Sequence, residues 1–138
     1  MIDCLFCRIA AGDVPCRQIW ADEDAIAFLD ISPWQLGHTL VIPRRHVADG
    51  GAGAQPWHEV AAALAGTAAL LKERLNADGL NILSNAGAVS GQEVFHFHVH
   101  VIPRYADNPG MAGLMLRDPA AAADLDALAA RLAVRPES

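Results

Sequence analysis

The spacing of apolar and polar positions predicts three short strands in the first third of the chain. Residues 17–22 and 25–29 are moderately apolar and flank the acidic sequence DED, which is typical of a hairpin turn. The run TLVI over residues 39–42 predicts a third strand. We expect this strand to stop at Pro43, because proline cannot donate a hydrogen bond to a sheet.

Apolar residues recur at helical spacing in the middle of the chain and predict one long helix. The sequence ADGGAGA before it is typical of a loop. Pro56 suits the first turn of the helix, where a missing N–H group costs nothing, and the helix should end near residues 76–79. Its predicted apolar face consists of Trp57, Val60, Ala61, Leu64, Ala68, Leu71 and Leu75.

Two shorter helices are predicted near the ends of the chain. Residues 4–11 form an apolar segment that ends at Gly12. Towards the C-terminus, Asp118 is a suitable N-cap and Pro119 a suitable first helical residue. The last helix is expected to carry a narrow apolar stripe of Leu125, Leu128, Ala129 and Leu132.

Two further strands complete the predicted sheet. They lie at residues 80–84 and 94–102, joined by the glycine-containing loop NAGAVSGQE. No internal repeat or long linker interrupts the chain, so we expect residues 1–138 to form a single domain. The fold class is therefore α+β, with a mostly antiparallel sheet of about five strands and helices packed on it.

The stretch VFHFHVHVIPR holds three of the six histidines, at alternate positions 96, 98 and 100. On a strand these imidazoles would share one face, while the intervening Phe and Val side chains would form a core face. His96 and His100 would then lie about 13 Å apart, too far for one metal ion to bind all three. A water-exposed polar face is the alternative, but histidine typically supplies a neutral nitrogen base or nucleophile near pH 7.

Composition and charge limit the classes of partner. Apolar residues make up 53% of the 138 residues, and the net charge is −6 with a pI near 5.3. This balance argues against nucleic-acid binding, which needs clustered Lys and Arg, and leaves a small phosphorylated ligand open. No apolar run approaches the roughly 20 residues that span a bilayer, so we expect no membrane partner.

The cysteines and the N-terminal sequence predict a cytoplasmic protein. Met-Ile-Asp-Cys contains no secretion signal, and three cysteines are an odd number for a disulfide framework. Cys4 and Cys7 form a C-x₂-C pair, which is typical of half a zinc site, a redox pair or two buried thiols. The redox alternative is disfavoured because only three residues precede Cys4. Cys16 has no matching partner.

Three blocks together resemble the histidine triad (HIT) family, whose signature is His-x-His-x-His followed by apolar residues. DCLFCRIAAGDVP, AFLDISPWQLGHTLVIPRRHV and SNAGAVSGQEVFHFHVHVIPR are similar to its blocks in order and separation, and cover most of residues 3–104. Residues 105–138 form a variable tail, of which residues 105–117 are expected to shape the leaving-group side of the pocket. The resemblance implies a HIT-like fold, a homodimer built on the long helix and a sheet edge, and a bacterial-type protein.

The resemblance also implies a reaction at the α-phosphate of a nucleotide. His98 would attack phosphorus and form a covalent nucleotidyl-histidine that water hydrolyses. His100 and His38 would flank the phosphate, stabilising charge and relaying protons. Asp30 would hold the ribose, and Asn85, Gly91 and Gln92 the phosphate. The implied base slot consists of Leu5, Phe6, Ile9, Phe28, Leu29 and Ile31.

Two features concern the leaving group and a metal. Glu93 stands where many HIT proteins carry Ser or Thr beside the leaving group, which leaves its proton donor open. The zinc-containing subgroup implies a structural Zn²⁺ cofactor bound by two thiolates and two imidazoles. His96 would then be the member of the triad that serves the metal. The implied zinc ligands are Cys4, Cys7, His46 and His96.

The sequence leaves three functions open. The preferred one is a hydrolase of purine nucleotide derivatives, either phosphoramidates and adenylylated amines or dinucleoside polyphosphates. The second is a metal-dependent hydrolase with an open metal on His38, His98 and His100. The third is a nucleotide sensor or scaffold in which hydrolysis is incidental.

Overall fold

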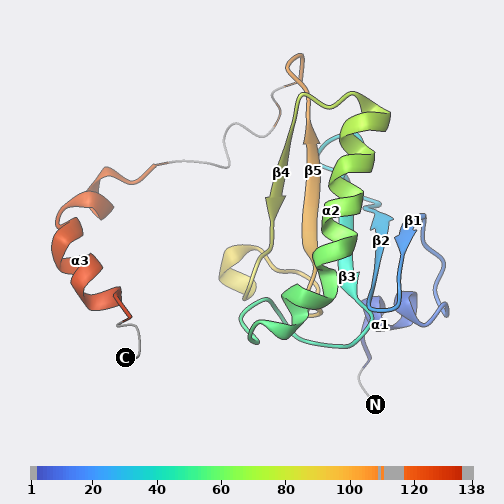
Figure 1. The fold of residues 1–138 in the computed structure, drawn as a ribbon, viewed down its shortest axis with the longest axis horizontal. Helices are drawn as coiled ribbons and strands as arrows, with labels where there is room; N and C mark the ends of the chain where they lie inside the picture. The colour runs from blue at the N-terminus through green and yellow to red at the C-terminus, as the bar shows by residue number, and fades with distance from the viewer. Residues whose placement is uncertain (1–2, 109, 111–116, 135–138) are drawn as a thin grey trace.

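A five-stranded antiparallel sheet forms the centre of the molecule (Figure 1). The computed structural model describes residues 3–108, 110 and 117–134. The strand order is β1-β2-β3-β5-β4, and each neighbouring pair is antiparallel. This confirms the predicted α+β class. The strands are β1 (Gln18–Ala21), β2 (Ala25–Leu29), β3 (Thr39–Pro43), β4 (Gly79–Leu83) and β5 (Val99–Arg104).

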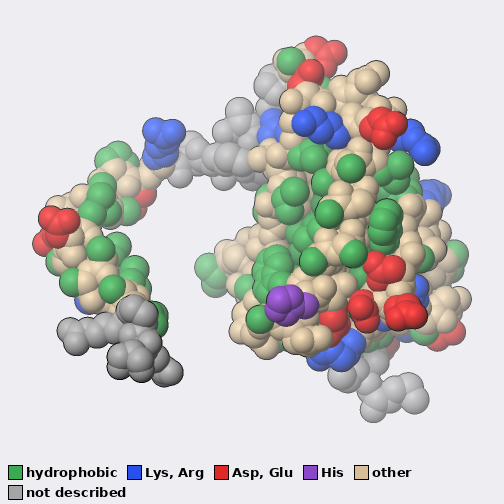
Figure 2. Space-filling model, viewed as in Figure 1, with side chains coloured by type: hydrophobic (Ala, Val, Ile, Leu, Met, Phe, Trp, Pro, Cys, Tyr) green, Lys and Arg blue, Asp and Glu red, His purple; other side chains and the backbone are tan. Residues whose placement is uncertain are grey.

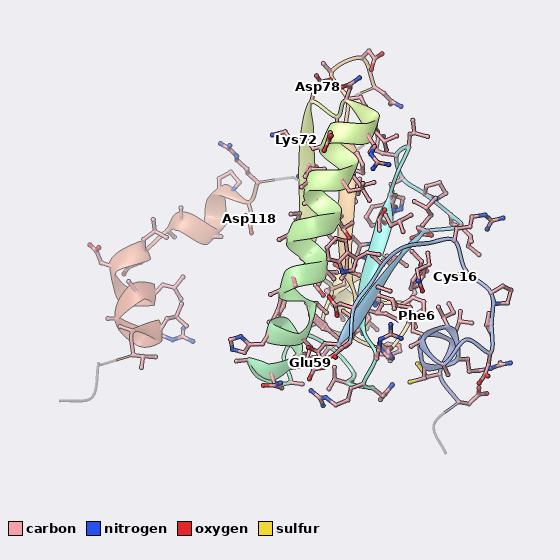
Figure 3. All side chains as sticks on the ribbon, turned by 45° about the vertical axis from the view of Figure 1, so that its right-hand side comes forward. Phe6, Cys16, Glu59, Lys72, Asp78 and Asp118 are labelled. Carbon is pink, nitrogen blue, oxygen red and sulfur yellow. The ribbon has the colours of Figure 1, made fainter. Side chains whose placement is uncertain are left out.

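The two faces of the sheet carry separate apolar clusters. Helix α2 (Gln55–Leu75) covers one face, where Ala25, Val41 and Val99 point. Helix α1 (Leu5–Ala10) belongs to the cluster on the other face. Side chains alternate along a strand, so the residues between those core positions reach the α1 face. Phe6 and Cys16 lie on this side of the sheet, away from α2 (Figure 3).

Helix α2 begins and ends where the sequence predicts, but its buried face is rotated. Ala61 is exposed, and Trp57 is 41% exposed even though its ring packs against Phe97. The prediction of this face was wrong at these positions because side-chain size, besides hydrophobicity, decides the contact. Small residues allow the helix to approach the sheet. The buried residues are Pro56, Val60, Ala63, Thr67 and Leu71.

The predicted strand at residues 94–102 was wrong at its start. Strand β5 begins only at Val99 and continues to Arg104. Before it, the backbone bonds elsewhere: Phe97 N–H donates to the carbonyl of Val47 at 2.7 Å. Phe95 is 52% exposed and does not join the core face. The histidines at 96 and 98 therefore precede the strand, and the three imidazoles do not share one straight strand face.

Strand β3 extends one residue further than predicted. Pro43 lies within it and pairs with Ala25. Proline lacks an N–H group but keeps its carbonyl, and this carbonyl accepts a hydrogen bond from the His96 ring. The lost backbone donor is thus compatible with a buried position.

The C-terminal helix forms as expected but does not pack on the sheet. Asp118 caps the short 3₁₀ helix η3 (Pro119–Ala122), and α3 (Leu125–Leu132) follows it. In Figure 1, α3 stands apart from the sheet, and all of its residues are exposed. The apolar stripe predicted for this helix is therefore exposed. Within the described residues, no helix combines the length and apolar character needed to cross a bilayer.

Gly66 of α2 permits the close approach of β1. A Cβ atom there would overlap the indole of Trp20. We predict that Gly66→Ala lowers the free energy of unfolding by about 1–2 kcal/mol, because overpacking outweighs the better helix propensity of alanine. Urea denaturation measures the change. Gly79→Ala is the control, since a Cβ there has no neighbour within 4 Å; equal losses in both variants would contradict the explanation.

Candidate functional site

A cavity of about 530 Å³ opens on the α1 face of the sheet. Its volume is within the range of small-molecule pockets. Elements that are distant in sequence contribute to it: α1, β2, the loop after β2, residues 85–94 and β5. The residues implied by the resemblance that line it are Leu5, Phe6, Ile9, Phe28, Leu29, Asp30, Ile31, His38, Asn85, Gly91, Glu93, His98 and His100.

The cavity has an apolar end next to a histidine-rich end. The rings of Phe6 and Phe28 meet edge to face with centroids 5.5 Å apart. The Phe6 ring also lies 5.2 Å from the His98 ring, edge to face. Phe6 therefore stands between an apolar slot and the first histidine of the reactive end.

His98 has one ring nitrogen fixed by a hydrogen bond to its own chain segment. Its Nδ1 lies 2.7 Å from the carbonyl oxygen of His96. Because a carbonyl can only accept, Nδ1 carries the proton and Nε2 keeps its lone pair. The hydroxyl of Ser84 donates to the carbonyl of His98 at 2.7 Å and holds the same residue from the β4 side. This is the tautomer that a histidine nucleophile requires.

His38 and His100 form a buried pair beside His98. His38 Nε2 and His100 Nδ1 are 2.8 Å apart, and an Asp30 carboxylate oxygen lies 3.6 Å from His38 Nε2. Burial, together with the neighbouring His98 and His38, lowers the pKa of His100 to about 4, against the opposing effect of Asp30. Burial also lowers the pKa of His38, against the opposing effect of Asp30. Both rings are therefore neutral at pH 7.

The loop from Asn85 to Gln92 contributes Asn85 and Gly91 to the lining of the cavity. Gly91 has φ of 104°, which favours glycine, and a Cβ there would lie 3.4 Å from the amide nitrogen of Asn85. Gln92 does not line the cavity. Its buried amide accepts from Gly87 N–H and donates to the carbonyls of Ala48 and Val94, so it builds the loop from inside.

A second cluster joins the residues implied as metal ligands. Sγ of Cys4 and Sγ of Cys7 each lie 3.4 Å from His96 Nδ1, and Cys7 Sγ lies 3.3 Å from His46 Nδ1. His96 Nε2 donates to the carbonyl of Pro43 at 2.9 Å, so Nδ1 turns its lone pair towards the sulfurs. The four ligand atoms lie within 4.8 Å of one another.

The donor set of this cluster fits a closed tetrahedral zinc site. Burial, followed by the neighbouring Cys4, raises the pKa of the Cys7 thiol to about 11 in the metal-free chain. The Cys7 thiol therefore resists ionisation until a cation offsets the charge of its thiolate. His96 belongs to this cluster and lines no part of the cavity. The structure thus assigns His96 a different position from His98 and His100.

Sequence reasoning missed several cavity residues. Cys16, which had no assigned role, lines the cavity, and burial raises the pKa of its thiol. Trp34 packs against the His38 and His100 rings, but its loop position carries no periodic signal that would have revealed this. The expected contribution of residues 105–117 falls largely on residues outside those described. The missed lining residues are Val14, Pro15, Cys16, Arg17, Ser32, Trp34, Leu40 and Val94.

The fold and the site define a small α+β domain that presents histidines in a ligand-sized cavity beside a Cys₂His₂ cluster. Residues 11–107 match the HIT domain, and the chain belongs to the histidine triad (HIT) family. An uncharacterised HIT-like protein of Mycoplasma genitalium is 45% identical over 108 residues, 78% of this chain and 77% of that protein.

Two further relatives bear on the site. An adenosine 5′-monophosphoramidase of Schizosaccharomyces pombe is 36% identical over 114 residues, 80% of each chain. The crystal structure of a zinc-bound histidine triad family protein from Mycobacterium smegmatis superposes with a TM-score of 0.75 at 38% identity. That alignment covers 91% of this chain and 97% of the other.

The low pKa of His100 predicts a pH-dependent stability. The ring faces His98, His38 and Asp30. Its unfolded pKa is about 6.5, so the unfolded chain binds more protons between pH 6.5 and 4. We predict that the free energy of unfolding falls by roughly 2–3 kcal/mol over this interval, measured by urea denaturation at several pH values.

A variant series isolates this contribution. His100→Asn removes the titrating ring and should flatten the pH dependence. His58→Asn, on the exposed surface of α2, should leave the slope unchanged. An unchanged slope in His100→Asn would show that other groups cause the acid sensitivity.

Proposed function

We propose that this protein hydrolyses purine nucleotide derivatives at the α-phosphate through a covalent nucleotidyl-histidine on His98. The observation that carries the proposal is the ring of His98 in the cavity, with Nδ1–H held by the His96 carbonyl and Nε2 carrying the lone pair. Family membership supports nucleotide hydrolase or transferase chemistry. The phosphoramidase name of the yeast relative supports the narrower assignment.

The reaction has two balanced displacements. In the first, His98 Nε2 forms a bond to phosphorus while the bond to the leaving group breaks and the leaving group takes up a proton from solvent. The ring becomes cationic, and the carbonyl of His96 stabilises it by accepting from Nδ1–H. In the second, water attacks phosphorus and gives up one proton to solvent, while the bond between Nε2 and phosphorus breaks, the nucleoside monophosphate leaves and the lone pair returns to Nε2.

The two ends of the cavity suit the two parts of a nucleotide. The apolar slot around Phe6 and Phe28 suits a purine base. Asp30 is placed to accept hydrogen bonds from ribose hydroxyls. Asn85 and the glycine turn at Gly91 suit the phosphate, because side-chain amides and backbone N–H groups stabilise developing negative charge.

Glu93 lines the cavity and is exposed. It therefore contacts solvent at the open end, where a leaving group would depart. We propose phosphoramidates and adenylylated amines as the first substrates to test and dinucleoside polyphosphates as the second, since Glu93 would repel the polyphosphate anion and attract an amine.

A structural zinc ion and a homodimer complete the proposal. The Cys₂His₂ donor set and the zinc-bound relative support the metal. Figure 2 shows hydrophobic side chains along the outward surface of α2, where Ala61, Ala62, Ala65 and Ala69 are exposed. This surface, together with the edge strand β4, is the proposed contact between two copies.

We predict that His98→Ala abolishes hydrolysis of an adenosine phosphoramidate, a loss of at least about 10³-fold, while AMP binding stays within a few-fold of wild type. Mass spectrometry of rapidly quenched wild-type protein should detect an adenylyl adduct on His98. His58→Ala, on the exposed surface of α2, is the matched control with normal activity.

Chelation separates the metal-dependent alternative, which assigned an open metal to His38, His98 and His100. The structure groups Asp30, in place of His98, with His38 and His100, whose ligand atoms lie within 4.8 Å of one another. If folded, chelator-treated protein forms no adduct and regains activity in proportion to an added divalent metal, this trio and not His98 is the reactive centre. Wild-type turnover by His98→Ala would also refute the nucleophile.

We predict roughly one zinc ion per chain by elemental analysis of purified protein. Cys7→Ser should lose the metal and lower the free energy of unfolding, because the ligands then lack a cation. Cys16→Ser, a half-buried thiol outside the cluster, should keep both. Less than half a zinc ion per wild-type chain after reconstitution would count against the site.

A further inference from the structure

Trp34 is placed directly against the His38–His100 pair. Its indole stacks on the His100 ring at a centroid distance of 5.4 Å and an interplanar angle of 11°. It also lies 5.2 Å from the His38 ring. The residue belongs to the loop between β2 and β3, lines the cavity and is 45% exposed. An aromatic ring at this position covers the histidine pair from the solvent side.

The main chain of Trp34 contacts the same pair. Its N–H group donates to His38 Nδ1 at 3.0 Å. A backbone N–H can only donate, so Nδ1 must be the unprotonated nitrogen of His38. Neutral His38 therefore carries its proton on Nε2, the nitrogen that lies 2.8 Å from His100 Nδ1.

The tautomer of His38 in turn determines the tautomer of His100. Its Nδ1 accepts the proton of His38 Nε2–H, so the single proton of a neutral His100 ring must be on Nε2. A sequence of two hydrogen bonds, from the Trp34 amide through His38 to His100, has only one direction. The outcome is that His100 offers an N–H donor and not a lone pair through its remaining nitrogen.

We propose that Trp34 is a positioning residue that holds His38 and His100 in this one neutral tautomer, so that His100 presents an N–H group to the reacting phosphate. The Trp34 amide sets the direction of the hydrogen bonds. The indole holds the orientation of the His100 ring and shields it from water. The role in the reaction rests on the proposed function; the tautomer itself does not.

The arrangement also restricts what the pair can do. His38 Nδ1 is occupied by the Trp34 amide, so His38 cannot gain a second proton without losing that bond. Asp30 is the acidic group beside the pair, and its carboxylate is 3.6 Å from His38 Nε2, further than His100 Nδ1. The pair therefore stabilises developing negative charge by donating a hydrogen bond and does not pass a proton through His38 Nδ1.

Nitrogen-15 NMR of histidine-labelled protein tests the tautomer directly. Wild type should show His38 and His100 as single Nε2–H tautomers at pH 7. Trp34→Leu keeps the amide but removes the stacked ring that holds the loop against the histidine pair. The amide at position 34 should then exchange faster, and His100 should become a mixture of tautomers. Trp34→Phe, which keeps an aromatic face, should restore the wild-type pattern.

Kinetics test the consequence for the reaction. In Trp34→Leu, the rate of adenylyl transfer to His98 should fall about 10-fold or more, while AMP affinity stays within twofold. Trp57→Leu is the matched control: that ring is similarly exposed, at 41%, but packs on Phe97 on the other side of the sheet. It should change stability without changing the tautomers or the transfer rate.

Other outcomes overturn the inference in identifiable ways. An unchanged Nε2–H tautomer and transfer rate in Trp34→Leu would show that the indole has no positioning role. A weaker AMP affinity with an unchanged transfer rate would make Trp34 a nucleotide contact. If wild type shows the tautomers but no adduct on His98, the proposed function fails and the tautomer assignment stands.

Discussion

The hydrogen bond from His98 Nδ1–H to the carbonyl of His96 is the interaction on which the site depends. It joins two neighbouring centres, because the side chain of His96 turns towards Cys4 and Cys7 while its carbonyl turns towards His98. A regular strand would have used that carbonyl in the sheet. The chain joins the sheet only at Val99, so the carbonyl of His96 is not used in strand pairing. The histidines are thereby divided between two environments.

The two faces of the sheet have different roles, one in packing and one in forming the cavity. One face packs on α2 and contains the larger apolar cluster. The other carries the cavity, so His100 lies beside Leu40 on the face away from α2. A packed sheet deforms little, and the side chains that must meet within hydrogen-bond distance therefore project from a rigid support. Two loop residues complete the site: Trp34 packs against His38 and His100, and Gln92 holds its own loop by hydrogen bonds.

Periodicity predicted the elements because it reports which side of a helix or strand is apolar. It did not predict the start of β5, since the bond between Phe97 N–H and Val47 competes with strand pairing and leaves no trace in the pattern. It also predicted an apolar stripe on α3, but such a stripe shows only that a helix can pack, and every residue of α3 is exposed. Motif resemblance located many of the cavity residues, although it included Gln92, which does not line the cavity. Neither periodicity nor motif resemblance identified Trp34, because its contacts arise from the path of a loop.

The conformation of one loop depends on a single atom, the side-chain nitrogen of Gln92. Its amide nitrogen donates to two carbonyl oxygens while its oxygen accepts from Gly87. Deamidation would preserve the shape of the side chain and place a carboxylate oxygen against the carbonyls of Ala48 and Val94. The neighbouring Glu93 carries the same group at an exposed position. Chemical ageing at this single buried amide would thus destabilise the loop from Asn85 to Gln92 beside the cavity while leaving the sheet intact.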